Sequence, residues 1–113
     1  MTQMEHRIHE EQGYHIVTLT GEIDLETSPH TRQILLNTVD RCTKLLIDMA
    51  SVTYIDSSGI ATLVETFQRA KKNGRQLAFI CLNPAIVRVL TLARLEKVFT
   101  IHADKESAIH AQS

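Results

Sequence analysis

The rest of this chain is organised around the stretch Tyr54-Ile55-Asp56-Ser57-Ser58-Gly59-Ile60. A buried strand is expected to end just before Asp56, and a long amphipathic helix is expected to begin at about Ser57. A helix start presents free backbone N–H groups and a partial positive charge. A serine at this position is therefore either an ordinary N-cap or a hydroxyl that takes part in chemistry.

Outside this stretch, β-rich and helix-like patterns alternate along the chain. Four helices are predicted, beginning near Ser28, Ser57, Asn83 and Asp104, where a serine, asparagine or aspartate can act as the cap. The third helix is expected to turn Ile86, Val87, Leu90 and Ala93 inward. Residues 21–25 are expected to be a loop. The predicted strands are residues 5–11, 14–20, 44–50, 76–81 and 98–101.

This alternation predicts an α/β fold with a four- to five-stranded mixed sheet, mostly parallel, with an antiparallel first strand and about four helices. Residues 1–113 are expected to form a single domain, because no linker, repeat or low-complexity segment interrupts them. Strands should be added in sequence order, with the crossover helices mainly on one face. Asp24, Asp56-Ser57 and Asn83 each follow a predicted strand, so we expect them on one rim of the sheet.

Composition excludes several classes of function. With 12 basic and 13 acidic residues, nothing favours nucleic acid or an anionic membrane. No apolar run reaches the length of a membrane span, and no hydrophobic signal region opens the chain, so a cytoplasmic location without membrane insertion is expected. Cys42 and Cys81 are expected to be free, buried thiols, and neither a metal site nor a cofactor motif is predicted.

Two catalytic interpretations of the Asp56-Ser57 junction are disfavoured. A serine hydrolase needs a histidine held against the serine, and the pattern G-x-S-x-G is absent. A phosphoacceptor aspartate of the receiver type would need a paired acidic cluster and a late lysine, which the sequence does not provide. We therefore predict that the protein is not an enzyme. The residues alone leave two alternatives open, that Ser57 only caps its helix or that it has a functional role.

The motifs in this chain resemble the STAS domain of bacterial anti-sigma factor antagonists. The core of the resemblance lies at the predicted junction between a strand and a helix, and the similarity spans nearly the whole chain. The matching segments are Asp56-Ser57-Ser58-Gly59-Ile60, Leu46-Ile47-Asp48, Val52-Thr53-Tyr54-Ile55, Gly21-Glu22-Ile23-Asp24, Asn83-Pro84 with Val87 and Leu90, Leu92-Ala93-Arg94-Leu95, and Val98-Phe99.

The resemblance implies a phosphorylation switch. The unphosphorylated protein would bind an anti-sigma factor that is also a serine kinase, and so release a sigma factor. Phosphorylation of Ser57 would end the complex, and a phosphatase would restore it. By the same resemblance Asp56 and Ser58 flank the acceptor, Gly59 lets a partner approach closely, and Asp24 contributes to the contact surface.

A second function stays open beside the switch. Some STAS proteins regulate or scaffold transporter complexes, such as phospholipid-transport ATPases, without a phosphorylation cycle. The intact Asp-Ser-Ser-Gly motif favours the switch. The basic tract from Arg69 to Arg75 is either a docking surface or a solvated helix face. The protein is expected to be a monomer or a weak dimer.

Overall fold

The computed structural model describes residues 4–112 and contains one five-stranded sheet with four helices. The strands lie in sequence order, β1-β2-β3-β4-β5; β1 is antiparallel to β2 and the other pairs are parallel. The predicted fold class is therefore confirmed. The elements are β1 (Met4–Glu11), β2 (Tyr14–Ile23), α1 (Ser28–Arg41), β3 (Lys44–Ile55), α2 (Ser57–Lys72), β4 (Gln76–Ile80), α3 (Pro84–Leu92), β5 (Ile101–His102) and α4 (Lys105–Gln112).

The first two strands form a β-hairpin, which accounts for the predicted antiparallel first strand. Gln12 and Gly13 have φ values of 52° and 84°, and two central residues with positive φ are typical of the tight turn that matches strand twist. Residues 21–23, expected to be a loop, instead continue β2 and pair with the end of β3. The pairing passes two register shifts, and Gly21 at φ 108° supplies the backbone conformation that such a bulge favours.

The strand β3 is longer than predicted and extends well past its neighbour. Its partner β4 ends at Ile80, which is paired with Asp48, whereas β3 continues to Ile55 beside β2. Each strand residue advances about 3.3 Å, so the far end of β3 lies beyond the end of β4. The carboxyl edge of the sheet is therefore staggered, and among residues 4–112 only those of β2 and β3 reach its tip.

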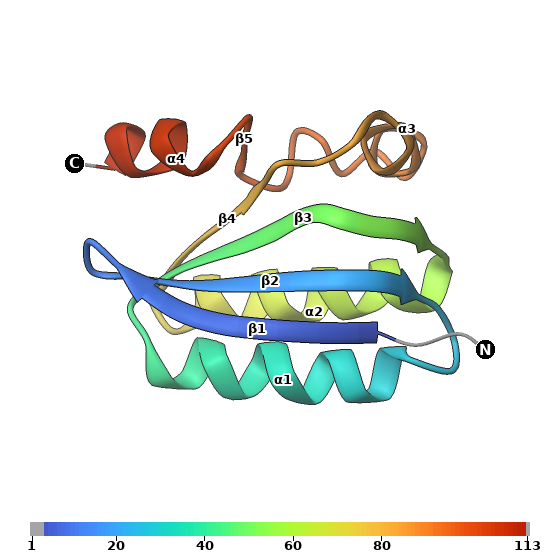
Figure 1. The fold of residues 1–113 in the computed structure, drawn as a ribbon, viewed down its shortest axis with the longest axis horizontal. Helices are drawn as coiled ribbons and strands as arrows, with labels where there is room; N and C mark the ends of the chain where they lie inside the picture. The colour runs from blue at the N-terminus through green and yellow to red at the C-terminus, as the bar shows by residue number, and fades with distance from the viewer. Residues whose placement is uncertain (1–3, 113) are drawn as a thin grey trace.

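The three crossover helices share one core, as right-handed connections require. Buried residues of α1, α2 and α3 belong to the same apolar cluster, which includes Leu35, Leu63 and Leu90. The helix α4 packs on a second, smaller cluster through Ala108, against Ile16 and Leu46 of the sheet. In Figure 1, α1 and α2 run along the molecule, and the arrowheads of β2 and β3 mark the end where both helices begin.

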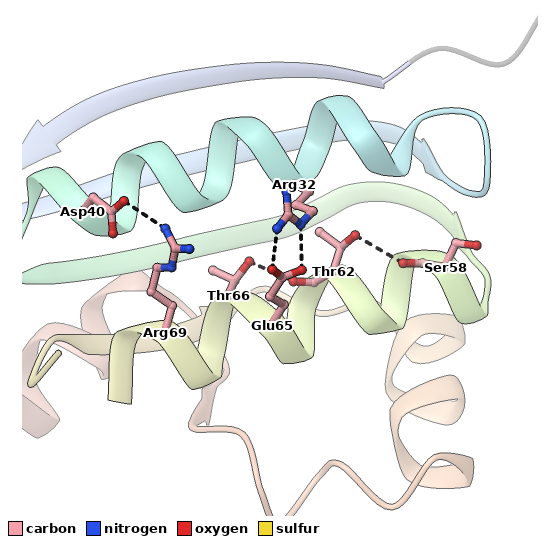
Figure 2. A network of polar contacts seen from close by, with 7 residues as sticks. All are labelled: Arg32, Asp40, Ser58, Thr62, Glu65, Thr66 and Arg69. Atoms are coloured by element: carbon pink, nitrogen blue, oxygen red, sulfur yellow. Dashed lines mark hydrogen bonds and ion pairs between the residues drawn. The ribbon is translucent and has the colours of Figure 1, made fainter. Parts of the chain in front are cut away.

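Two ion pairs hold α2 against α1. Arg32 donates from two nitrogens to the two carboxylate oxygens of Glu65, at 2.7 and 2.6 Å, and Arg69 donates to Asp40 at 3.0 Å. Figure 2 shows these pairs side by side along the two helices, each bridging from one helix to the other. Both lie at the surface, so they set the relative position of the helices more than they stabilise the fold.

Several sequence expectations in the second half need correction. Ile86 and Leu90 are buried as predicted, but Val87 is 42% exposed and Ala93 is exposed, because the inward face of α3 is narrow. The last strand is only Ile101–His102. Cys42 is buried and Cys81 is only partly buried; both are free thiols, as expected. Cys81 lies outside β4 at φ 60°, where the strand geometry has ended.

Candidate functional site

The N-terminus of α2 is capped by Asp56, and Ser57 is the first helical residue. Asp56 has extended φ and ψ of −110° and −170°, and its Oδ1 accepts a hydrogen bond from the Gly59 N–H at 3.0 Å. The expectation that a serine caps this helix is therefore wrong. Aspartate caps as well as serine does, and its charge suits the positive end of the helix.

The second oxygen of Asp56 connects α2 to the loop after β2. Asp56 Oδ2 accepts from the Leu25 N–H at 3.1 Å, and the Asp56 N–H donates to the Ile23 carbonyl at 3.2 Å. One aspartate thus joins two segments that are 31 residues apart in sequence. The carboxylate has both oxygens engaged by backbone amides and makes no hydrogen bond to the Ser57 hydroxyl.

Asp24 is held inside its own loop. Its Oδ1 accepts from the Glu26 and Thr27 N–H groups, both at 3.0 Å. The Thr27 hydroxyl completes the turn, because it accepts from the Asp24 N–H at 2.9 Å and donates to the Glu22 carbonyl at 2.8 Å. Within the described residues the hydrogen bonds to this carboxylate all fall on Oδ1, which leaves Oδ2 for an outside donor.

This loop also explains why Ser28 does not cap α1. The residue before the helix is Thr27, whose hydroxyl is already used in the turn, and α1 has no side-chain cap. Ser28 is buried and its Oγ has no hydrogen-bond partner. Pro29 occupies the first turn of α1, where its missing N–H costs nothing.

Gly59 is buried, and its lack of a side chain allows a close contact inside the chain. A Cβ built on Gly59 would lie 2.5 Å from the Ile23 carbonyl oxygen and 2.6 Å from Ile55 Cγ1. The first turn of α2 can therefore rest directly on the ends of β2 and β3. The predicted contact of Gly59 with a partner stays a prediction, and the approach that the structure shows is internal.

Ser57 and Ser58 differ in exposure. Ser57 is exposed, and Ser58 is half-buried. The Ser58 carbonyl accepts from the Thr62 hydroxyl at 3.2 Å, and in Figure 2 the Ser58 hydroxyl points away from that contact. Of the two, Ser57 is the hydroxyl that another protein reaches more easily.

The surface around Ser57 combines acidic and apolar side chains. Asp24, Glu26 and Asp56 line a hollow of about 490 Å³ together with Leu25 and Tyr54. Leu25 is 76% exposed and Tyr54 is 50% exposed, so two large side chains with apolar surface lie open to solvent beside the carboxylates. We call these five residues the acidic rim. The sequence patterns did not single out Leu25, Glu26 or Tyr54, because nothing in their spacing marks them as exposed.

Asn83 does not join the acidic rim. Its side chain caps α3 by accepting from the Ile86 N–H at 3.0 Å, as predicted, and its Nδ2 donates to the Val52 carbonyl at 2.7 Å. Val52 lies three residues before the end of β3. Because β4 stops early, the turn after it reaches the side of β3 and not its tip. The structure thus brings Asp24, Asp56 and Ser57 together and leaves Asn83 further back.

The chain matches a known protein family over most of its length. The STAS domain model matches residues 5–108. The chain belongs to the STAS domain family. The anti-sigma-B factor antagonist of Bacillus subtilis is 30% identical to this STAS chain over 93 residues, which is 82% of this chain and 85% of the relative.

Two further anti-sigma factor antagonists are similar to this chain over most of its length. The anti-sigma F factor antagonist of Paenibacillus polymyxa is 27% identical over 109 residues, covering 95% of this chain and 90% of that protein. The crystal structure of an anti-sigma factor antagonist from Mycobacterium paratuberculosis superposes with a TM-score of 0.88 at 26% identity, covering 96% of this chain and 93% of that one. The relatives with these names are regulatory proteins.

Two further properties bear on the site. Between residues 4 and 112, no helix of this STAS domain is long and apolar enough to cross a membrane. Over the same residues, no three side chains of histidine, cysteine, aspartate or glutamate are grouped so that they could hold a metal ion.

Proposed function

We propose that this protein is an anti-sigma factor antagonist that is switched by phosphorylation of Ser57. In its unphosphorylated form it binds an anti-sigma factor that is also a serine kinase, and this releases a sigma factor. The observation that carries the proposal is that the cap of α2 and the exposed hydroxyl belong to two different residues. Asp56 does the capping, so the exposed Ser57 hydroxyl is free to accept a phosphate.

The acidic rim is the proposed docking surface. Leu25 and Tyr54 offer exposed apolar groups, which suit the buried centre of an interface. Asp24 Oδ2 is available to a cationic donor, and the acidic rim as a whole favours a partner with arginine or lysine at its contact. Asp56 belongs to the acidic rim and also acts indirectly, because it fixes the loop that presents Leu25.

Phosphate on Ser57 is expected to leave the fold intact and to block the complex. A phosphate carries a charge of about −1.5 to −2, and the free N–H groups of a helix start accommodate it. In the complex, the kinase must bring the phosphates of its nucleotide within reach of Ser57, so the phosphorylated product faces like charge. An uncompensated charge in an interface costs about 3–5 kcal/mol, which corresponds to roughly a hundredfold to a few thousandfold loss of affinity.

A direct test incubates the protein with the candidate kinase and ATP and maps the phosphosite by mass spectrometry. Phosphate is expected on Ser57 in the natural protein and in Ser58→Ala, and none in Ser57→Ala. Ser57→Ala should still bind the kinase in a calorimetric titration, and the phosphorylated protein should bind at least a hundredfold more weakly. Equal affinity of the two forms would rule out the switch.

The same experiment separates the transporter alternative that the resemblance leaves open. A STAS subunit that only scaffolds a transporter needs no phosphate acceptor, so it would bind its partner with or without Ser57 phosphorylation. A serine kinase encoded beside this gene supports the switch, and a permease there supports the scaffold. A phosphatase that acts on phosphorylated Ser57 completes the proposed cycle.

A further inference from the structure

A second hollow lies at the opposite end of α2 from Ser57, where β4 begins. Its volume is about 460 Å³, within the range of small-molecule sites. Phe67 of α2, Leu77 of β4 and Val98 supply apolar lining. Val98 is 55% exposed although it belongs to this lining, so an apolar surface is open to solvent there. We call this hollow the α2 C-terminal cavity.

Two cations also line the α2 C-terminal cavity. Lys71 and Arg75 come from the basic tract of residues 69–75, which carries no acidic residue. Within residues 4–112 neither of them takes part in an ion pair, whereas Arg69 is paired with Asp40. The Ala70 carbonyl at the end of α2 is bonded to the Arg75 N–H at 2.7 Å. The two side-chain charges therefore have no carboxylate partner in the described chain.

The side chain of Arg75 is held in place, but not all of its hydrogen-bond donors have an acceptor. Its Nη1 donates to the Cys42 carbonyl at 2.9 Å, which fixes the guanidinium against the end of α1. Its Nε is buried and has no hydrogen-bond partner. Nε itself is closed to a ligand, but a negative charge near the guanidinium would still be attracted to its positive charge.

We propose that the α2 C-terminal cavity binds a small amphipathic anion, a phosphate monoester or carboxylate that carries an aromatic or branched apolar group. The anionic end lies against Lys71 and Arg75, and the apolar group covers Phe67, Leu77 and Val98. At 1.5 Å per residue, Lys71 is about 21 Å along the helix from Ser57. The site is thus separate from the acidic rim, and its occupation does not depend on the proposed phosphorylation switch.

The test uses phenyl phosphate as the probe and follows the backbone amides of the ¹⁵N-labelled full chain by NMR. Saturable shifts are expected at residues 71, 75–77 and 98–100, with none at residues 56–58. Phenol tests the need for charge, and inorganic phosphate tests the need for the apolar group. Each should bind at least tenfold more weakly than phenyl phosphate. Equal binding by either one, or shifts that do not saturate, would overturn the proposal.

Matched variants locate the charge requirement. Lys71→Gln should weaken phenyl phosphate binding at least fivefold, whereas Lys72→Gln, an exposed neighbour outside the lining, should leave it unchanged. Arg75→Gln should also weaken binding, but it breaks the bond to Cys42 and needs a parallel thermal melt. If Lys71→Gln and Lys72→Gln bind phenyl phosphate equally, the cavity is not the site.

Discussion

The Asp56 carboxylate lies 3.1 Å from the Leu25 amide and 3.0 Å from the Gly59 amide, so one side chain holds both the helix start and the neighbouring loop. The residue beside the proposed phosphate acceptor is therefore structural. It positions the loop that carries an exposed leucine, and it frees Ser57 from any role in capping.

Removal of the two hydrogen bonds of the Asp56 carboxylate should destabilise the protein more than the loss of an ordinary helix cap. Asp104 provides a matched control, because its Oδ1 caps α4 by accepting from the Ser107 N–H at 2.8 Å and holds no distant loop. Asp104→Ala should lower the free energy of unfolding by about 1 kcal/mol, and Asp56→Ala by about 2 kcal/mol, since a cap and one further hydrogen bond are lost. Urea unfolding monitored by circular dichroism measures both. Equal losses would mean that the Leu25 bond contributes nothing.

Gly59→Ala should destabilise the protein although alanine favours helices. The new Cβ would meet the Ile23 carbonyl at 2.5 Å, and a backbone atom cannot move aside cheaply. Overpacking of this kind costs about 1–3 kcal/mol. Gly74→Ala is the control, because its Cβ would meet nothing within 4 Å and only the strain of its φ of 69° remains. If thermal melts show Gly59→Ala to be as stable as the natural protein, the close contact at Gly59 carries no cost.

Exposed leucines at two places allow the docking surface to be tested. Leu25 is 76% exposed in the acidic rim, and Leu92 is 79% exposed at the end of α3. Leu25→Ala should weaken binding to the anti-sigma factor at least tenfold, whereas Leu92→Ala should not change it. Neither should alter stability by more than about 0.5 kcal/mol, because both side chains are already in water. Surface plasmon resonance measures the affinities, and the reverse ranking would place the interface on α3.

The ion pair between Arg32 and Glu65 should give stability a measurable dependence on pH. Hydrogen bonding by the guanidinium lowers the pKa of Glu65 below its ordinary value. The stability that the ion pair contributes is therefore fully present above the pKa of about 4.3 that Glu65 has in the unfolded chain. It is lost as the pH falls through the lower pKa that Glu65 has in the folded protein. Arg32→Gln should lower the urea midpoint at pH 7 but not at pH 2. An equal drop in the urea midpoint at pH 7 and at pH 2 would show that Arg32 acts through packing.

Cysteine reactivity should report on Asp48. Burial raises the pKa of the Cys81 thiol, and the nearby charge of Asp48 raises it further. Because only the thiolate reacts, Asp48→Asn should speed the modification of Cys81 by a disulfide reagent at pH 8. Cys42 is the internal control; burial is the largest cause of its raised pKa, and Asp48 does not contribute. Peptide mapping of the labelled thiols separates the two sites, and an unchanged Cys81 rate would refute the role of Asp48.

The sequence predicted the order of elements, because strands and helices differ in the spacing of apolar residues and most helix starts carry a cap residue. It failed where the backbone departs from that regularity. The extension of β2 through residues 21–23 depends on two register shifts, which no local pattern encodes. The capping role of Asp56 was missed because aspartate and serine are equally good caps, and only the folded backbone, which places the Gly59 N–H on the Asp56 carboxylate, distinguishes them.

The site was predicted in part. Asp24 and Asp56 come together because they follow neighbouring parallel strands, which the alternation of elements already implies. Asn83 was misplaced because strand length, and hence the stagger between β3 and β4, is set by pairing over the whole sheet. Leu25 and Tyr54 were overlooked, since exposure of an apolar side chain is a property of the folded surface.

Asp56 as the cap has a consequence for how such a protein can change during evolution. Residue 57 is exposed and makes no contact on which the helix start depends, so its identity is nearly neutral for folding. Under the proposed switch, a single substitution there would abolish phosphate acceptance, mimic it permanently or exchange serine for threonine. If the proposed switch holds, regulation could be gained or lost at position 57 without a compensating change elsewhere in the chain.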